Sequence, residues 1–147
     1  MNPPSIAFLI CWQGNYPWYF PYFLHSCRYN PDIDFLIFTS NEDAKLDLPA
    51  NAKIIPCSIA QFKAAAAKAL GFKVAAESGY KLYEFKPAYG FIFFDYIKDY
   101  DFWGYCDVDV IFGNIATDVE SMTHVVRRLQ EKNRLRAYFE FQIRFWR

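Results

Sequence analysis

Two short apolar runs, IAFLICW at residues 6–12 and IDFLIFT at residues 33–39, constrain the fold of this chain more than any other feature. Each run has seven residues, and each is followed by residues that favour turns or loops, QGNYP after the first and SNED after the second. Bounded runs of this length and near-continuous apolar character are typical of strands that are buried on both faces. We therefore expect a parallel sheet that is covered on both sides.

Two further strands and three helices extend this pattern. Strands are predicted at residues 52–57, where Pro56 limits the strand, and at residues 101–106. Strands that alternate with helices predict an α/β fold with a mostly parallel sheet and flanking helices, as in Rossmann-like proteins.

The predicted helices carry signals at their ends. In WYFPYFLHSCRYNP the aromatic residues and Leu recur at helical spacing, and Pro21 falls in the first turn. In SIAQFKAAAAKALGF, Ser58 stands at the N-cap, Gln61 stands at the capping-box position and Gly71 ends the helix. A third helix is expected around Pro87–Lys98, with Pro87 in its first turn.

Charge is distributed unevenly along a chain whose length suits one domain. The 147 residues have a formal net charge of zero, so no overall field favours nucleic acid, and we expect no nucleic-acid partner. Residues 127–147 nevertheless hold seven Arg or Lys against two Glu, a local charge of +5. This break in composition divides the chain into a main part, residues 1–118, and a divergent basic tail, residues 119–147.

The cysteines and the apolar runs predict the cellular compartment in which the protein is found. The four cysteines form no CxxC pair and no spacing typical of zinc sites, which favours free thiols in a reducing cytosol. No N-terminal segment has the pattern of a signal peptide, and no apolar run is long enough to span a membrane. A cytoplasmic protein is expected.

Two carboxylates follow the fourth predicted strand. Asp107 and Asp109 stand one residue apart, and side chains at positions i and i+2 of extended backbone point to the same side. Open α/β sheets bind ligands beyond the carboxyl ends of their strands. Two carboxylates there suit Mn²⁺ or Mg²⁺, whose remaining ligands are commonly waters and substrate phosphates. The alternative is a solvated turn, which Asp-x-Asp also marks.

The stretch YDFWGYCDVDVIFGNI resembles the metal-binding segment of glycosyltransferases with the GT-A fold. The longer stretch YKLYEFKPAYGFIFFDYIKDYDFWGYCDVDVIFG, with its FKPAYG block, is similar to a bacterial group of capsule-type glycosyltransferase-like proteins. The N-terminal stretch IAFLICWQGNYPWYFPYFLHSCRYNPDIDFLIFTSN resembles the same group, so the resemblance covers about residues 5–116. It implies that residues 1–118 are the donor-binding part of a GT-A-like domain.

The resemblance also implies roles for particular residues. Asp107 and Asp109 would hold Mn²⁺ or Mg²⁺ against the diphosphate of a nucleotide sugar. Lys86 would lie near the sugar or the phosphates, the alternative being a solvated lysine at a helix start. The other implied substrate-binding residues, for which ordinary turn residues are the alternative, are Gln13, Asn15, Tyr16 and Asn114.

The tail departs from the family pattern. Little of the chain resembles the family after residues 115–119, so a truncated or frameshifted member is expected, with the acceptor half and its catalytic residues missing. The implied activity is sugar transfer from a nucleotide donor to a glycan or lipid-linked acceptor. His124 is a candidate third metal ligand or a surface residue. The sugar, the base, the acceptor and the stereochemistry of transfer are left open.

Two other functions stay open beside sugar transfer. One is a non-catalytic remnant that binds a nucleotide or a metal. The other is an interaction module in which VVRRLQEKNRLRAYFEFQIRFWR forms an amphipathic basic helix on the inner face of an anionic membrane. The alternative for the tail is packing on an exposed sheet edge or disorder.

Overall fold

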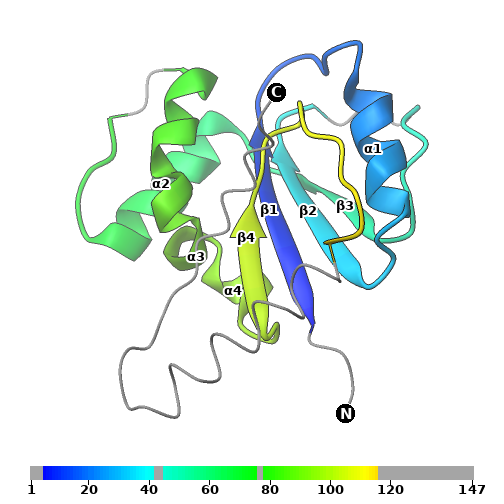
Figure 1. Ribbon diagram of the computed structural model, residues 1–147. Coiled ribbons are helices and arrows are strands. Elements are labelled where there is room, and N and C mark those ends of the chain that lie inside the picture. Colours follow the sequence, from blue (N-terminus) through cyan, green and yellow to red (C-terminus); the bar gives the residue numbers. More distant parts are fainter. Residues whose placement is uncertain (1–4, 42–44, 76–77, 116–147) are drawn as a thin grey trace.

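The computed structural model describes residues 5–41, 45–75 and 78–115 (Figure 1). Within these ranges the four strands form one parallel sheet in the order β3-β2-β1-β4. The predicted α/β fold with a parallel sheet is confirmed. The strands are β1 (Ile6–Trp12), β2 (Ile33–Thr39), β3 (Ala52–Pro56) and β4 (Phe102–Tyr105).

Both faces of the sheet are buried, which explains the continuous apolar runs. Along β1, Phe8 and Ile10 pack on one face, whereas Leu9 and Cys11 pack on the other. All four side chains are at most 5% exposed. Because successive side chains of a strand point to opposite faces, a strand covered on both sides needs apolar residues at every position.

Helices cover the two faces, with α1 (Phe20–Arg28) on one side and α2 (Ile59–Leu70) on the other (Figure 1). Pro21 lies in the first turn of α1, as predicted. The predicted capping box of α2 is also present. Ser58 accepts a hydrogen bond from the backbone N–H of Gln61, whose side chain accepts one from the backbone N–H of Ser58, and Gly71 ends the helix with a φ of 77°.

The segment before β4 differs from its prediction. Instead of one helix around Pro87–Lys98, it forms a 3₁₀ helix, η1 (Gly79–Ala88), and two single turns, α3 (Tyr89–Ile92) and α4 (Phe94–Ile97). Pro87 therefore lies inside η1 and not in a first α-helical turn. The break falls at Phe93, whose φ and ψ of −107° and 24° are not helical and whose ring stacks on Phe38 at 3.8 Å.

Several predictions of the sequence concern residues that the structure does not describe. The basic tail at residues 119–147, its amphipathic helix, the domain boundary at residue 118 and the ligand candidate His124 all lie outside the described residues. All four cysteines lie within them, and all four are buried free thiols, as expected. Among the described helices, none has both the length and the apolar character that crossing a membrane requires.

The order of the strands creates a place for a ligand. From β1 the chain passes through α1 to β2, whereas from β3 it crosses back over the opposite face to reach β4 on the other side of β1. The strand order therefore reverses between β1 and β4. A reversal of this kind marks the position at which open α/β sheets bind ligands, beyond the carboxyl ends of the strands.

Candidate functional site

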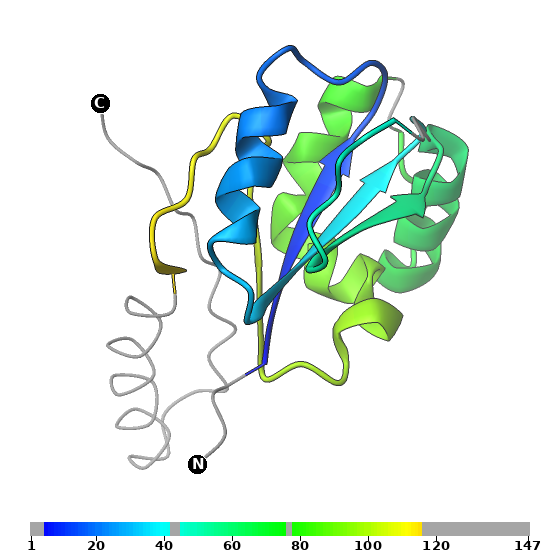
Figure 2. The same ribbon diagram turned by 90° about the vertical axis from the view of Figure 1, so that its right-hand side faces the viewer.

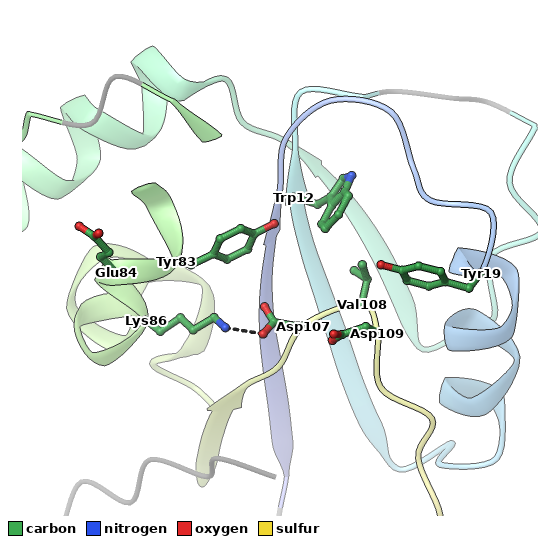
Figure 3. A pocket seen from close by; sticks show the side chains of 8 residues that line it. All are labelled: Trp12, Tyr19, Tyr83, Glu84, Lys86, Asp107, Val108 and Asp109. Atoms are coloured by element: carbon green, nitrogen blue, oxygen red, sulfur yellow. Dashed lines mark hydrogen bonds and ion pairs between the residues drawn. The ribbon is translucent and has the colours of Figure 1, made fainter. Parts of the chain in front are cut away.

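A cleft of about 590 Å³ opens at the carboxyl ends of β1 and β4 (Figure 3). Trp12, the last residue of β1, contributes one wall, and the turn that follows β4 contributes another. A third wall comes from η1. The other lining side chains are Tyr19, Tyr83, Glu84, Lys86, Asp107, Val108 and Asp109.

Lys86 and Asp107 form an ion pair inside this cleft. Lys86 Nζ lies 2.6 Å from Asp107 Oδ2, a short charge-assisted hydrogen bond (Figure 3). The lysine side chain is only 17% exposed, and its ammonium lies over the rings of Tyr83 and Tyr105, at 5.2 and 5.8 Å from their centroids. The structure therefore brings Lys86 to the predicted carboxylates and does not leave it as a solvated lysine.

Asp109 lines the same cleft in a different environment. Strand β4 ends at Tyr105, so both aspartates lie beyond the strand, and Asp109 lies with Val108 in a turn. Asp109 is exposed, and the ion pair found at the cleft among the described residues involves Asp107 alone. One carboxylate is thus engaged by a lysine, whereas the other faces solvent.

The segment that carries both aspartates is held by the residues that follow it. Residues 106–115 run back along the α1 face of the sheet (Figure 2). Phe112 is 6% exposed and packs against the rings of Phe8, Phe23 and Phe35 at centroid distances of 5.3 to 5.9 Å. The apolar residues of VIFGNI thereby anchor the turn to the core.

Asn114, a predicted substrate-binding residue, lies away from the cleft. Its neighbours are tied to Asn30, which donates a hydrogen bond to Gly113 O and accepts one from the backbone N–H of Ile115, both at 2.9 Å. Asn30 lies just before β2, and its carbonyl accepts a hydrogen bond from the backbone N–H of Ile33, the first residue of that strand. The described contacts therefore place Asn114 at the amino edge of the sheet, opposite the cleft.

At the end of β1, Trp12 lines the cleft, while the polar residues of the loop that follows make other contacts. Gln13 donates a hydrogen bond to Cys57 O at 2.8 Å. The hydroxyl of Tyr16 donates to Asn41 O at 2.9 Å, and its ring stacks on a ring of α1 at 4.2 Å. Asn15 is exposed, and its carbonyl accepts a hydrogen bond from the Trp12 indole at 3.0 Å. Gln13, Asn15 and Tyr16 therefore support the loop and do not line the cleft.

Three aromatic residues of the cleft were not predicted from the sequence. Trp12 and Tyr19 lie on the β1 side, and Tyr83 lies on η1, three residues before Lys86. That spacing is a signal that was missed, because residues i and i+3 of a 3₁₀ helix project in the same direction. Burial and the nearby Asp107 carboxylate raise the pKa of Tyr83 to about 12, so its phenol is protonated at neutral pH and able to donate a hydrogen bond.

The donor atoms at the cleft suit a hard divalent cation that shares its coordination with a ligand. Asp107 and Asp109 supply carboxylate oxygens on one cleft, and Mg²⁺ and Mn²⁺ commonly take one or two carboxylates beside waters and phosphates. The described residues contain no group of three His, Cys, Asp or Glu side chains placed to hold a metal. The residues present therefore fit a metal ion whose coordination shell is completed by a bound phosphate. They do not form a site in which protein side chains supply every ligand.

Comparison with known proteins identifies a family without assigning an activity. A family model described as "Family of unknown function (DUF6625)" matches residues 8–131, which is most of the chain. Neither the curated proteins nor the solved structures yield a match. The resemblance to glycosyltransferases consequently stays a prediction.

Proposed function

We propose that this chain, which belongs to the DUF6625 family of unknown function, binds a nucleotide-diphosphate sugar together with Mn²⁺ or Mg²⁺ and transfers the sugar to an acceptor. One observation carries the proposal. A lysine, two aspartates and three aromatic rings meet in a cleft at the carboxyl ends of β1 and β4, where the strand order of the parallel sheet reverses.

The charges of the cleft favour a divalent cation as part of the ligand. One lysine stands against the three carboxylates Glu84, Asp107 and Asp109, a formal charge of −2. A diphosphate brought alone into this cleft would be repelled, since Asp107 already neutralises Lys86 at 2.6 Å. A divalent cation bound with the diphosphate would neutralise that excess, and nucleotide binding is therefore expected to depend on metal.

Each side chain has a role that follows from its position. Asp109, which is exposed, and Asp107 would hold the ion, and the bound ion would neutralise charge on the diphosphate leaving group. Among the described residues that line the cleft, Lys86 is the cation, and the protonated phenol of Tyr83 is a hydrogen-bond donor beside it. The rings of Trp12 and Tyr19 offer apolar faces on which a base or a sugar can stack.

Titration calorimetry tests donor binding. UDP and GDP are each added to the protein with MnCl₂ and then with excess EDTA. We expect binding of at least one nucleotide with Mn²⁺, a loss of at least tenfold in affinity with EDTA, and a similar loss in Asp109→Asn. Asp32→Asn, which removes an exposed carboxylate elsewhere on the surface, is the matched control.

Two results contradict the proposal. One is the absence of binding by either nucleotide to the wild-type protein. The other is binding that neither EDTA nor Asp109→Asn changes. If the nucleotide binds but no sugar is released from UDP-sugars or GDP-sugars with glycan or lipid-linked acceptors, the alternative of a non-catalytic nucleotide-binding protein is supported instead. We place this activity in the cytoplasm, where nucleotide sugars would be the donors.

A further inference from the structure

The outer side of α1 carries a row of exposed rings. Trp18, Tyr22, His25 and Tyr29 follow one another at intervals of four, three and four residues, which places them along one side of a helix. Trp18 is 82% exposed, Tyr22 is 61% exposed and Tyr29 is 70% exposed. The rings of Trp18 and Tyr22 lie 6.2 Å apart, and those of His25 and Tyr29 lie 5.1 Å apart. We call these four residues the aromatic row.

The aromatic row is not required by the core. The inner side of α1 already supplies the buried residues Phe20, Phe23, Leu24 and Cys27. The outer side holds no Leu, Ile, Val or Phe, only rings with a polar atom and other polar or small residues. Tyr, Trp and His rings expose apolar faces while their polar atoms stay hydrated, which is typical of binding surfaces rather than of exposed core residues.

A hollow lined by both charged and apolar side chains lies beside the aromatic row. It has a volume of about 270 Å³, and His25 belongs both to the row and to the lining of the hollow. Arg28 and Asp47, which also line it, form an ion pair with 3.0 Å between Arg28 Nη2 and Asp47 Oδ2. Exposed hydrogen-bond donors and acceptors therefore stand next to apolar ring faces.

The aromatic row continues into the candidate site. The Trp18 ring meets the Tyr19 ring edge-to-face at a centroid distance of 5.6 Å, and Tyr19 lines the cleft. The row therefore extends from the cleft along α1. Helix α1 itself has eight helical steps, roughly 12 Å at about 1.5 Å per residue, and Trp18 and Tyr29 extend the row beyond its two ends, so the row is long enough for several linked sugar units.

We infer that the aromatic row and the adjoining hollow bind a glycan chain. A pyranose ring has an apolar face of C–H groups that packs on an aromatic ring, and a rim of hydroxyls that needs donors and acceptors such as those of Arg28 and Asp47. The charged pair disfavours insertion into the hydrocarbon of a membrane. The identity of this glycan as the acceptor rests on the proposed function. In that role, the end of the glycan chain reaches the cleft past Tyr19.

Affinity electrophoresis tests the inference without any nucleotide. The protein is run through native gels that contain dextran, hydroxyethyl cellulose, galactomannan, xylan or alginate. We expect at least one polysaccharide to retard the wild-type protein, and Trp18→Ala/Tyr22→Ala to lose at least tenfold in apparent affinity. The matched control is Phe91→Ala/Phe94→Ala, which removes two exposed rings from α3 and α4, on the other face of the sheet, and should be retarded like wild type.

The outcomes separate this inference from the proposed function. Absence of retardation by every polysaccharide, or equal retardation of the wild type and the Trp18→Ala/Tyr22→Ala variant, overturns the glycan site even if the nucleotide binds. Row-dependent pelleting with phosphatidylglycerol vesicles, or a row-dependent dimer in sedimentation, without glycan retardation also overturns it. Calorimetry with nucleotide and Mn²⁺ on the single variant Tyr22→Ala is expected to match wild type, because the Tyr22 side chain does not line the cleft.

Discussion

Two irregular segments bring charged residues to the same cleft from opposite faces of the sheet. Residues 106–115 carry Asp107 and Asp109 along the α1 face, whereas η1 carries Lys86 on the face that α2 covers. A buried aromatic residue accompanies each segment: Phe112 lies within the first, and Tyr89 directly follows η1.

The two segments differ in how far their contacts extend. Residues 106–115 cross the sheet and are tied through Asn30 to its amino edge, and Phe112 meets rings from β1, β2 and α1. Within η1, Leu82 is buried, and its carbonyl accepts a hydrogen bond from the Tyr89 hydroxyl at 3.0 Å. Residue Phe85 of η1 also meets a distant ring, Phe62 of α2, and Lys86 meets Asp107, but the backbone hydrogen bonds of a 3₁₀ helix have poorer geometry than those of an α-helix. We therefore expect η1 to open locally more readily than residues 106–115.

The largest expected effect comes from removing the ring of Phe112. Phe112→Ala deletes a ring that is 6% exposed and leaves a cavity among three other rings, so the free energy of unfolding should fall by about 3–5 kcal/mol. Urea denaturation followed by circular dichroism measures this loss. Phe112→Leu, which keeps most of the apolar volume, should lose less than about 1.5 kcal/mol.

Thiol labelling reports whether the effect of Phe112→Ala is local. Burial raises the pKa of Cys106 and of Cys11. Both thiols therefore react slowly with a labelling reagent at pH 8 in the native state, and they react mainly when the structure around them opens locally. Cys106 packs with Phe112, and Cys11 packs on the other face with Tyr89. Peptide mapping after labelling Phe112→Ala should show a greater increase in rate at Cys106 than at Cys11. Equal increases would mean that the two segments open together.

A smaller effect is expected from removing one hydroxyl on the other face. Tyr89→Phe deletes the donor to Leu82 O and keeps the ring, which leaves the carbonyl without that partner at a cost of about 1–3 kcal/mol. Urea denaturation measures the stability. In this variant the labelling rate should increase more at Cys11 than at Cys106. An unchanged stability and an unchanged labelling rate at Cys11 would show that the hydroxyl does not hold η1.

The smallest effect on stability is expected at the ion pair itself. In Lys86→Met the pair with Asp107 is lost, but that carboxylate is 43% exposed and hydrated, so stability should change by less than about 1 kcal/mol. Affinity for UDP or GDP with Mn²⁺ should fall about tenfold, because the cleft loses its cation. Lys81→Met, an exposed position on the same η1 helix, is the control and should bind like wild type. A large loss of stability without a loss of affinity would make Lys86 a structural residue.

The sequence predicted those features whose signals lie within a few residues of one another. The bounds of β1 and β2 follow from their apolar runs, and α2 follows from Ser58, Gln61 and Gly71, since capping hydrogen bonds join residues three or four apart. The helix predicted around Pro87–Lys98 was wrong as a single element. Its break at Phe93 depends on a ring of β2, which a local pattern does not report.

The candidate site also combines features that local sequence predicts with features that only the tertiary structure decides. The position of Asp107 and Asp109 after a buried strand was evident from the sequence alone, because strand ends and turn residues are local properties. Their partners were decided by the tertiary structure: Lys86 reaches Asp107 across 21 residues, and Asn30 holds the backbone of Ile115 across 85. Side chains so far apart in sequence meet only when the sheet order has been fixed. For this reason the rings of the cleft, the route of residues 106–115 and the aromatic row beside them became visible only in the folded chain.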